Sequence, residues 1–189
     1  GTTSFVDIDW GSNDFILLTA SIFLLIAVSF KCALYPFQFW VSDVYESAPM
    51  NMLPFLSTIP KISIIGFLIF FFNALTSNSL NHHILIIIAI ISIVSILVGS
   101  LLAIKQNNLL RLLAYSGIPH AGMMLIGIMS PNNISGDILI LYFTFYTVAN
   151  VGLYVCINSL PNSEEYLDID NLSGLYKNNT FLAICISCF

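Results

Sequence analysis

The chain alternates long apolar stretches with short polar connections, a pattern that predicts membrane-spanning helices. A helix needs about 20 apolar residues to cross a bilayer. The stretches are too long for the strands of a transmembrane barrel and do not alternate apolar with polar positions. We therefore predict an all-α polytopic transmembrane helix bundle, one domain over residues 1–189. Its predicted spans are about 14–34, 50–74, 84–104, 111–130 and 137–160, with the start of a sixth from 180 and an amphipathic segment at 37–48.

Composition supports this reading. Hydrophobic residues make up 58% of the chain and charged residues 8%, whereas soluble domains have roughly 25% charged residues. The net charge of −5 comes from carboxylates near the presumed span ends and in loops, so it is not evidence for a cationic partner. No nucleic-acid partner is expected. We expect the chain to be surrounded largely by lipid and by other apolar helices.

The basic residues of the connections give an orientation. Lys105, Arg111 and Lys177 all fall on the side opposite to the N-terminus. Cytoplasmic or matrix loops carry an excess of Lys and Arg, so this side is predicted to face the cytoplasm or the mitochondrial matrix. The last apolar run is too short to cross a bilayer, and we expect the chain to be a piece of something larger.

Two lysines interrupt the apolar stretches. Lys31 lies within SFKCALYPFQFW, with Pro36 five residues later, and Lys61 directly follows Pro60 in PFLSTIPKISI. A lysine inside a bilayer costs roughly 2.5–3.5 kcal/mol on insertion scales, so each should face a polar cavity, a partner carboxylate or the bundle interior. Proline removes a backbone N–H and frees the carbonyl four residues before it. We predict that the first helix breaks just beyond Lys31.

A buried lysine can carry a proton, because burial disfavours its charged form and a nearby anion favours it. Ser57 and Thr58 lie on the same helical face as Lys61. The alternative is that each lysine snorkels to the interface or holds a structural ion pair. Two lysines on consecutive spans, each near a proline, favour the proton-transfer hypothesis.

Other polar residues of the spans are candidates of lesser weight. His120 follows Pro119 in the fourth span and is a possible proton relay, or a hydrogen-bonding contact between helices. Tyr142, Tyr146 and Asn150 form a polar stripe at four-residue spacing, and such stripes are more often helix-packing hydrogen bonds. His82 and His83 are expected in an exposed loop tip without a specific role.

The cysteines suggest no metal or redox site. Cys32, Cys156, Cys185 and Cys188 lie in apolar stretches, and the C-x-x-C spacing of the last two falls in a run expected to enter the bilayer. Small apolar side chains are the simpler interpretation.

Three motifs together resemble the antiporter-like subunits of respiratory complex I. FKCALYPFQFWVSDVYESAP is similar to the segment in which a lysine-bearing helix breaks and leads into W-x-x-D-V-Y-x-x-A-P. The PK pair containing Lys61 and LLAIKQNNLLRLLAYSGIPHAG match further family motifs in order. GTTSF at the start and DIDNLSGLYKNNTFLAI are most similar to the subunit 2 branch of NADH dehydrogenase, as a central-to-C-terminal fragment.

The resemblance implies a proton-translocating membrane-arm subunit of NADH:ubiquinone oxidoreductase, with no redox centre in this chain. Lys31 would alternate between paired and unpaired states with a glutamate expected upstream, Lys61 would pass the proton onward, and His120 could act as a relay. Pro36 and Pro60 would have helix-breaking and structural roles. NADH, FMN, iron–sulfur clusters and ubiquinone are expected in other subunits, and no cofactor or metal in this chain.

The implied partners are other complex I subunits, including neighbouring antiporter-like subunits, chains that supply the missing N- and C-terminal helices, and membrane lipids. The richness in Ile, Asn, Phe and Leu suits an organellar genome. The expected location is therefore the mitochondrial inner membrane, with multiple crossings and the N-terminus facing the intermembrane space.

The sequence also departs from the family pattern. Gly117 stands where the family usually has a second serine, Pro119 where it often has alanine, and Leu110 where a basic residue commonly precedes Arg111. Two alternatives stay open: a subunit of a multisubunit cation/proton antiporter, and a structural scaffold fragment of a membrane complex.

Overall fold

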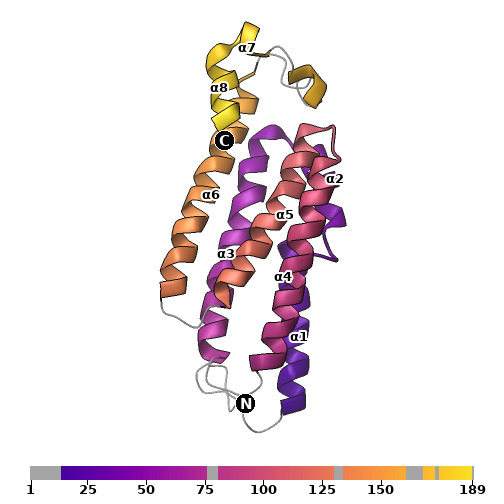
Figure 1. Cartoon of the computed structure of the whole chain (residues 1–189), viewed down its shortest axis with the longest axis vertical. Coiled ribbons are helices and arrows are strands. Elements are labelled where there is room, and N and C mark those ends of the chain that lie inside the picture. The colour runs from indigo at the N-terminus through magenta and orange to yellow at the C-terminus, as the bar shows by residue number, and fades with distance from the viewer. Residues whose placement is uncertain (1–13, 76–80, 130–133, 161–167, 173–174, 189) are drawn as a thin grey trace.

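The chain forms an elongated bundle of helices (Figure 1). The structure is a computed structural model, and it describes the chain except residues 1–13, 76–80, 130–133, 161–167, 173–174 and 189. The opening GTTSF and part of the SGL stretch therefore lie outside the described residues. The helices are α1 (Asp14–Lys31), α2 (Phe39–Ser47), η2 (Met50–Met52), α3 (Leu53–Leu75), α4 (Asn81–Ile104), α5 (Leu109–Ile128), α6 (Ile134–Asn158), η4 (Ile169–Leu172), α7 (Leu175–Asn178) and α8 (Thr180–Cys188).

Four helices of the described part are long and apolar enough to span a membrane. Their spanning segments are Met50–Ile69, Ile84–Ile104, Leu109–Ile128 and Gly136–Asn158. They run side by side along the height of the bundle (Figure 1). The transmembrane helix bundle predicted from the sequence is therefore confirmed as the fold class.

The region of the first predicted span differs from the others because it is not one long helix. Two shorter helices, α1 and α2, together follow the height of the bundle. α1 ends at Lys31, the chain turns through residues 32–38, and α2 continues toward the opposite end (Figure 1). Ala33 has a φ of 55°, in the left-handed region that ends a right-handed helix. Pro36 follows within the same turn and has no N–H for a helical hydrogen bond.

Hydrogen bonds from other elements compensate for the interrupted helix. The Trp40 indole Nε1 donates to the Phe30 carbonyl over 3.2 Å, and the Tyr35 N–H donates to the Ser95 hydroxyl of α4 over 3.0 Å. Trp40 also stacks on the Phe30 ring, with 5.8 Å between centroids. The break is thus fixed to both α1 and α4.

Two connections differ locally from the expected boundaries. Residues 82 and 83, expected in a loop tip, belong to the first turn of α4, which begins at Asn81. In the α4–α5 connection, the Asn108 side chain accepts hydrogen bonds from the N–H groups of Leu110 and Arg111 and caps α5. This cap satisfies two of the N–H groups that a helix start leaves unpaired.

α4 and α5 approach closely because glycines line their contact. A Cβ at Gly99 would lie 2.6 Å from Pro119 Cδ, and a Cβ at Gly122 would lie 2.9 Å from the Ser92 carbonyl oxygen. Small residues permit such close packing of membrane helices. This pair supports the face of α5 that carries the candidate site.

We predict that Gly122→Ala destabilises the protein by about 1–3 kcal/mol, because the added methyl group meets backbone that cannot rotate away. Gly66→Ala is the control, since nothing lies within 4 Å of the position of its Cβ. Thermal unfolding of the protein purified in detergent from its membrane measures the difference. Equal melting temperatures for the two variants would contradict the close packing of α4 and α5.

Candidate functional site

Lys61 lies inside the bundle where α3, α5 and α6 meet. Only 7% of its surface is exposed. Its ammonium donates hydrogen bonds to the Gly117 carbonyl of α5 over 3.0 Å and to the Tyr146 hydroxyl of α6 over 2.8 Å. The nitrogen also lies 5.1 Å from the centroid of the Tyr146 ring, close enough for a cation–π contact.

Both acceptors of the Lys61 ammonium are formally neutral. Among the described residues, the ion pairs of the structure belong to Arg111, which contacts Glu46 and Asp43 of α2. Lys61 therefore has no carboxylate partner in the described part of the chain. A structural ion pair, one of the alternatives raised by the sequence, is not what holds this lysine there.

The polar neighbours of Lys61 on its own helix do not contact its amine. The hydroxyls of Ser57 and Thr58 donate to the Pro54 carbonyl over 3.0 and 2.6 Å. α3 also continues without a break through Pro60. The polar environment of the amine is therefore supplied by α5 and α6.

His120 lies next to this site and connects it to a second tyrosine. Its Nδ1 is 2.7 Å from the Tyr142 hydroxyl, and its ring centroid is 5.0 Å from that of Tyr146. Lys61, Tyr146, His120 and Tyr142 thus form one continuous group of polar side chains across three helices. We call this group the lysine–tyrosine–histidine cluster.

Tyr146 is the functional candidate that sequence reasoning undervalued. The sequence shows its four-residue spacing with Tyr142 and Asn150, but such a stripe on a membrane helix by itself favours helix packing. Asn150 does bond within its own helix, donating to the Tyr146 carbonyl over 2.9 Å. The two tyrosine hydroxyls instead contact Lys61 and His120.

Lys31 is not part of this cluster. It is the last residue of α1 and its side chain is exposed on the described part of the chain, whereas the next residue, Cys32, is 4% exposed. The end of α1 lies well inside the height of the bundle rather than at either end (Figure 1). The structure thus brings Lys61 and His120 together and leaves Lys31 on a separate surface.

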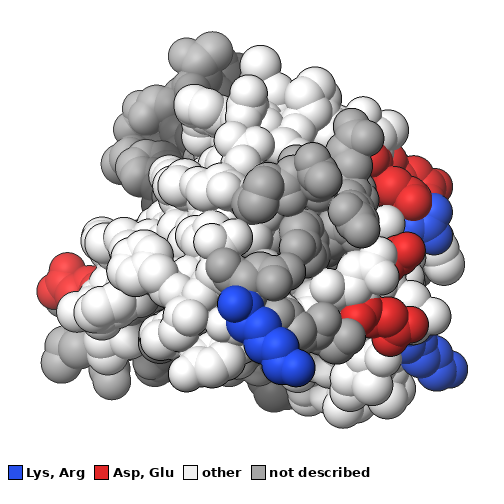
Figure 2. All heavy atoms as spheres, turned by 90° about the horizontal axis from the view of Figure 1, so that it is seen from above, with Lys and Arg blue, Asp and Glu red and all other residues white. Residues whose placement is uncertain are grey.

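Basic residues of the connections gather at one end of the bundle. The Ile169 N–H donates to the Asn107 carbonyl over 2.9 Å and ties η4 to the α4–α5 connection. This end also carries α7, opposite to the end where α1 begins (Figure 1). Viewed from there, most of the described acidic and basic side chains lie toward one side of the molecule (Figure 2).

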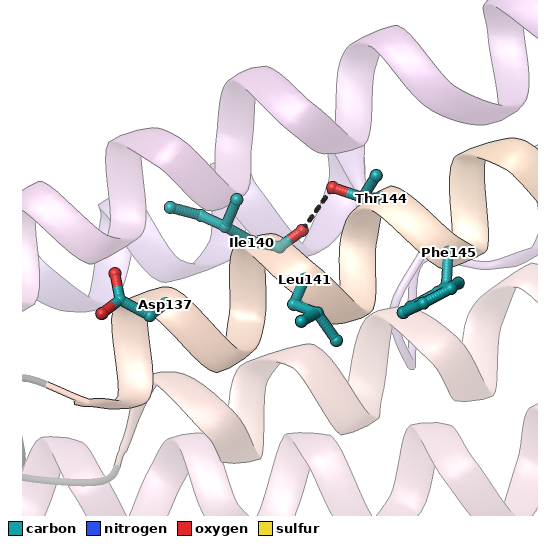
Figure 3. A pocket seen from close by; sticks show the side chains of 5 residues that line it. All are labelled: Asp137, Ile140, Leu141, Thr144 and Phe145. Carbon is teal, nitrogen blue, oxygen red and sulfur yellow. Dashed lines mark hydrogen bonds between the residues drawn. The ribbon is translucent and has the colours of Figure 1, made fainter.

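An open groove on α6 is separate from the cluster. Its lining consists of Asp137, Ile140, Leu141, Thr144 and Phe145 (Figure 3). The Thr144 hydroxyl donates to the Ile140 carbonyl of the same helix over 2.8 Å. The groove is mostly apolar and offers the side chains expected toward lipid or a neighbouring helix. In the part of the chain that the structure describes, no three His, Cys, Asp or Glu side chains come together to hold a metal ion.

The whole chain, residues 1–189, matches the family model described as NADH:quinone oxidoreductase/Mrp antiporter, TM. NADH-quinone oxidoreductase subunit N 2 of Thermodesulfovibrio yellowstonii is 40% identical over 170 residues, which are 90% of this chain and 36% of that protein. Subunit N of Geobacillus kaustophilus is 35% identical over 187 residues, which are 94% of this chain and 38% of that protein.

A third relative, NADH-quinone oxidoreductase subunit N 2 of Hydrogenobaculum sp., is 34% identical over 192 aligned residues, covering 100% of this chain and 41% of that protein. The chain therefore spans about two fifths of the length of the curated relatives it matches.

We predict that Tyr146→Phe lowers stability by about 1.5–3 kcal/mol, because it removes one of two acceptors from a buried ammonium. Tyr176→Phe is the control, since Tyr176 is 66% exposed on α7. Thermal unfolding in detergent measures both. A melting temperature for Tyr146→Phe that equals the control would show that the Lys61–Tyr146 hydrogen bond contributes nothing.

Proposed function

Because the chain belongs to the NADH:quinone oxidoreductase/Mrp antiporter transmembrane family, we propose that it is a proton-translocating membrane-arm subunit of an NADH:quinone oxidoreductase. The observation that carries the proposal is the buried Lys61 ammonium, bound to two neutral oxygens inside the bundle. The family resemblance inferred from the motifs is confirmed.

Lys61 suits proton transfer because opposing effects act on its charge. Burial away from water disfavours the ammonium, whereas two hydrogen-bond acceptors favour it. No carboxylate of the described residues fixes the charge. A change in a neighbouring charge can therefore decide whether Lys61 holds or releases its proton.

The lysine–tyrosine–histidine cluster offers a route for that proton. A tyrosine hydroxyl both donates and accepts hydrogen bonds, and an imidazole can do the same through its two nitrogens. The proton would pass from Lys61 to Tyr146, then to His120 and Tyr142. The distances of 2.8 Å from Lys61 to Tyr146 and 2.7 Å from His120 to Tyr142 support the two ends of this route.

Lys31 is proposed as a second proton-carrying group. Lys31 is the last residue of α1, and α1 ends away from either end of the bundle (Figure 1). An exposed ammonium at that height within a bilayer needs a polar partner. The glutamate that the family resemblance implies, outside this sequence, would serve as that partner.

Other parts of the enzyme would supply the electron transfer. NADH, FMN, iron–sulfur clusters and ubiquinone would bind to other subunits, and their reaction would drive proton movement here. Neighbouring antiporter-like subunits, chains carrying the remaining helices and membrane lipids would surround the bundle. This chain matches only about two fifths of the length of each of these relatives, which supports the proposal that other chains carry further helices.

We place the chain in the mitochondrial inner membrane, with its N-terminal side toward the intermembrane space. Lys105, Arg111 and Lys177 belong to the end that carries the α4–α5 connection and α7, opposite to the start of α1 (Figures 1 and 2). The excess of basic residues on matrix-facing loops supports this orientation.

A multisubunit cation/proton antiporter is the second candidate, because the family description includes Mrp antiporters. Such an assembly could use the same lysines without NADH. NADH oxidation by the purified assembly supports the oxidoreductase. Sodium-dependent proton exchange without NADH oxidation would instead support the antiporter.

In the assembled enzyme reconstituted in liposomes, we predict that Lys61→Met slows NADH-driven proton uptake by about 100-fold or more, the loss expected when a positioned acid–base group is removed. Methionine replaces the ammonium with an unbranched, apolar side chain, which suits a buried position. Lys177→Met, on the exposed α7, is the control. A pH-sensitive dye measures transport, and native gels measure assembly. Normal transport by assembled Lys61→Met enzyme would favour a scaffold role.

Lys31→Ala is predicted to assemble and to reduce proton uptake, because it removes the second proton-carrying amine. The expected loss is about 100-fold, as for other acid–base groups. Lys105→Ala is the control, since Lys105 is also exposed but lies at the end of the bundle. Transport equal to that of the control would remove Lys31 from the proposed route.

A further inference from the structure

Gly117 lies where a side chain and the Lys61 ammonium would compete for the same space. The residue is buried on α5. A Cβ at this position would lie 2.5 Å from Lys61 Nζ and 3.2 Å from the Tyr146 hydroxyl. Real Cβ atoms do not approach other heavy atoms as closely as the first of these distances. The ammonium can take its observed position only because residue 117 has no side chain.

Because Gly117 has no side chain, its own backbone carbonyl is accessible to the Lys61 ammonium. Lys61 Nζ donates to the Gly117 carbonyl over 3.0 Å. A carbonyl oxygen has two lone pairs, so a backbone carbonyl within a helix can accept from the ammonium as well. A carbonyl accepts and never donates, so it favours the protonated lysine over the neutral amine.

We propose that Gly117 is a positioning residue of the Lys61 proton site, which holds the ammonium between a backbone carbonyl and the Tyr146 hydroxyl by leaving the space of a side chain free. This inference rests on the proposed function and adds a determinant of it. Gly117 acts through Lys61 and does not itself carry the proton.

The geometry separates this role from one in overall folding. The atom that a Cβ would displace is the far end of a flexible side chain, since the nearest contact is Lys61 Nζ. The amine can move while α3 and α5 keep their places. Gly122 differs, because its Cβ would meet the Ser92 backbone. An alanine at position 117 should therefore preserve assembly and disturb mainly the lysine.

The chemistry of the substituted side chain makes the role testable. In Gly117→Ala the methyl group pushes the ammonium away from the carbonyl and offers no replacement acceptor. In Gly117→Ser the ammonium also has to move, but the new hydroxyl can accept its hydrogen bond. Serine should thus restore much of what alanine removes.

Other titratable groups around Lys61 stay the same in both variants. They are Tyr146 of α6, His120 of α5, Tyr45 of α2 and Cys32 after α1. Loss of an acceptor makes the ammonium release its proton at lower pH. The pH above which transport declines should therefore move downward in Gly117→Ala.

The test uses the assembled enzyme in liposomes, with NADH-driven proton uptake recorded across pH. We expect Gly117→Ala to assemble, to lose transport by about tenfold and to shift the alkaline limb of its pH profile down by about one unit, as for one lost hydrogen bond to a charged group. Gly117→Ser should keep most of the rate and a profile close to the unsubstituted enzyme. Gly66→Ala, which has open space at its Cβ, is the matched control on α3.

An unchanged rate and profile in Gly117→Ala would overturn the inference, and so would equal losses in the alanine and serine variants. Failure of Gly117→Ala to assemble while Gly117→Ser assembles with normal transport would also overturn it, because the glycine would then serve folding. Lys61→Met distinguishes the proposed function from this inference. Normal transport by Lys61→Met contradicts both, whereas loss in Lys61→Met with normal Gly117→Ala contradicts only the role of Gly117.

Discussion

The ammonium of Lys61 is held inside an apolar bundle by oxygens that come from two other helices, and the lysine–tyrosine–histidine cluster depends on this contact. A buried charge without partners would be costly. Gly117 of α5 and Tyr146 of α6 supply the acceptors. Because each contact requires its helix at hydrogen-bond distance, this environment for the ammonium exists only where the three helices meet.

Under the proposed function, proton transfer and stability would make opposing demands at this site. A carboxylate beside Lys61 would hold the charge more firmly, but it would also oppose release of the proton. The described site uses a backbone carbonyl and a phenol, which support the ammonium without an opposing charge. Arg111 of α5, at the end of the bundle, is instead paired with carboxylates, those of Glu46 and Asp43 of α2. Lys61 and Arg111 thus differ in the kind of partner that balances their charge.

The broken helix illustrates how local sequence and distant contacts combine. Pro36 predicted an interruption beyond Lys31, and α1 does end at that residue. The interruption is held in place by Trp40 and by Ser95, which lies on a helix far along the chain. Lys31, at the end of α1, is exposed on the described part, while Lys61, beside Pro60 in an unbroken helix, is buried. Similar lysine and proline patterns therefore led to different environments.

By itself, the sequence determined the membrane fold class, the approximate helix ranges and the family, because hydrophobic length and ordered motifs are local properties of the chain. It also identified Lys61 and His120 as unusual residues in apolar spans. Tertiary structure alone decided that Tyr146 joins them, that Gly117 provides the second acceptor, and that Lys31 lies apart. Those relations depend on the rotation and spacing of helices separated by 56 to 85 residues in the chain, which periodicity within one helix cannot specify.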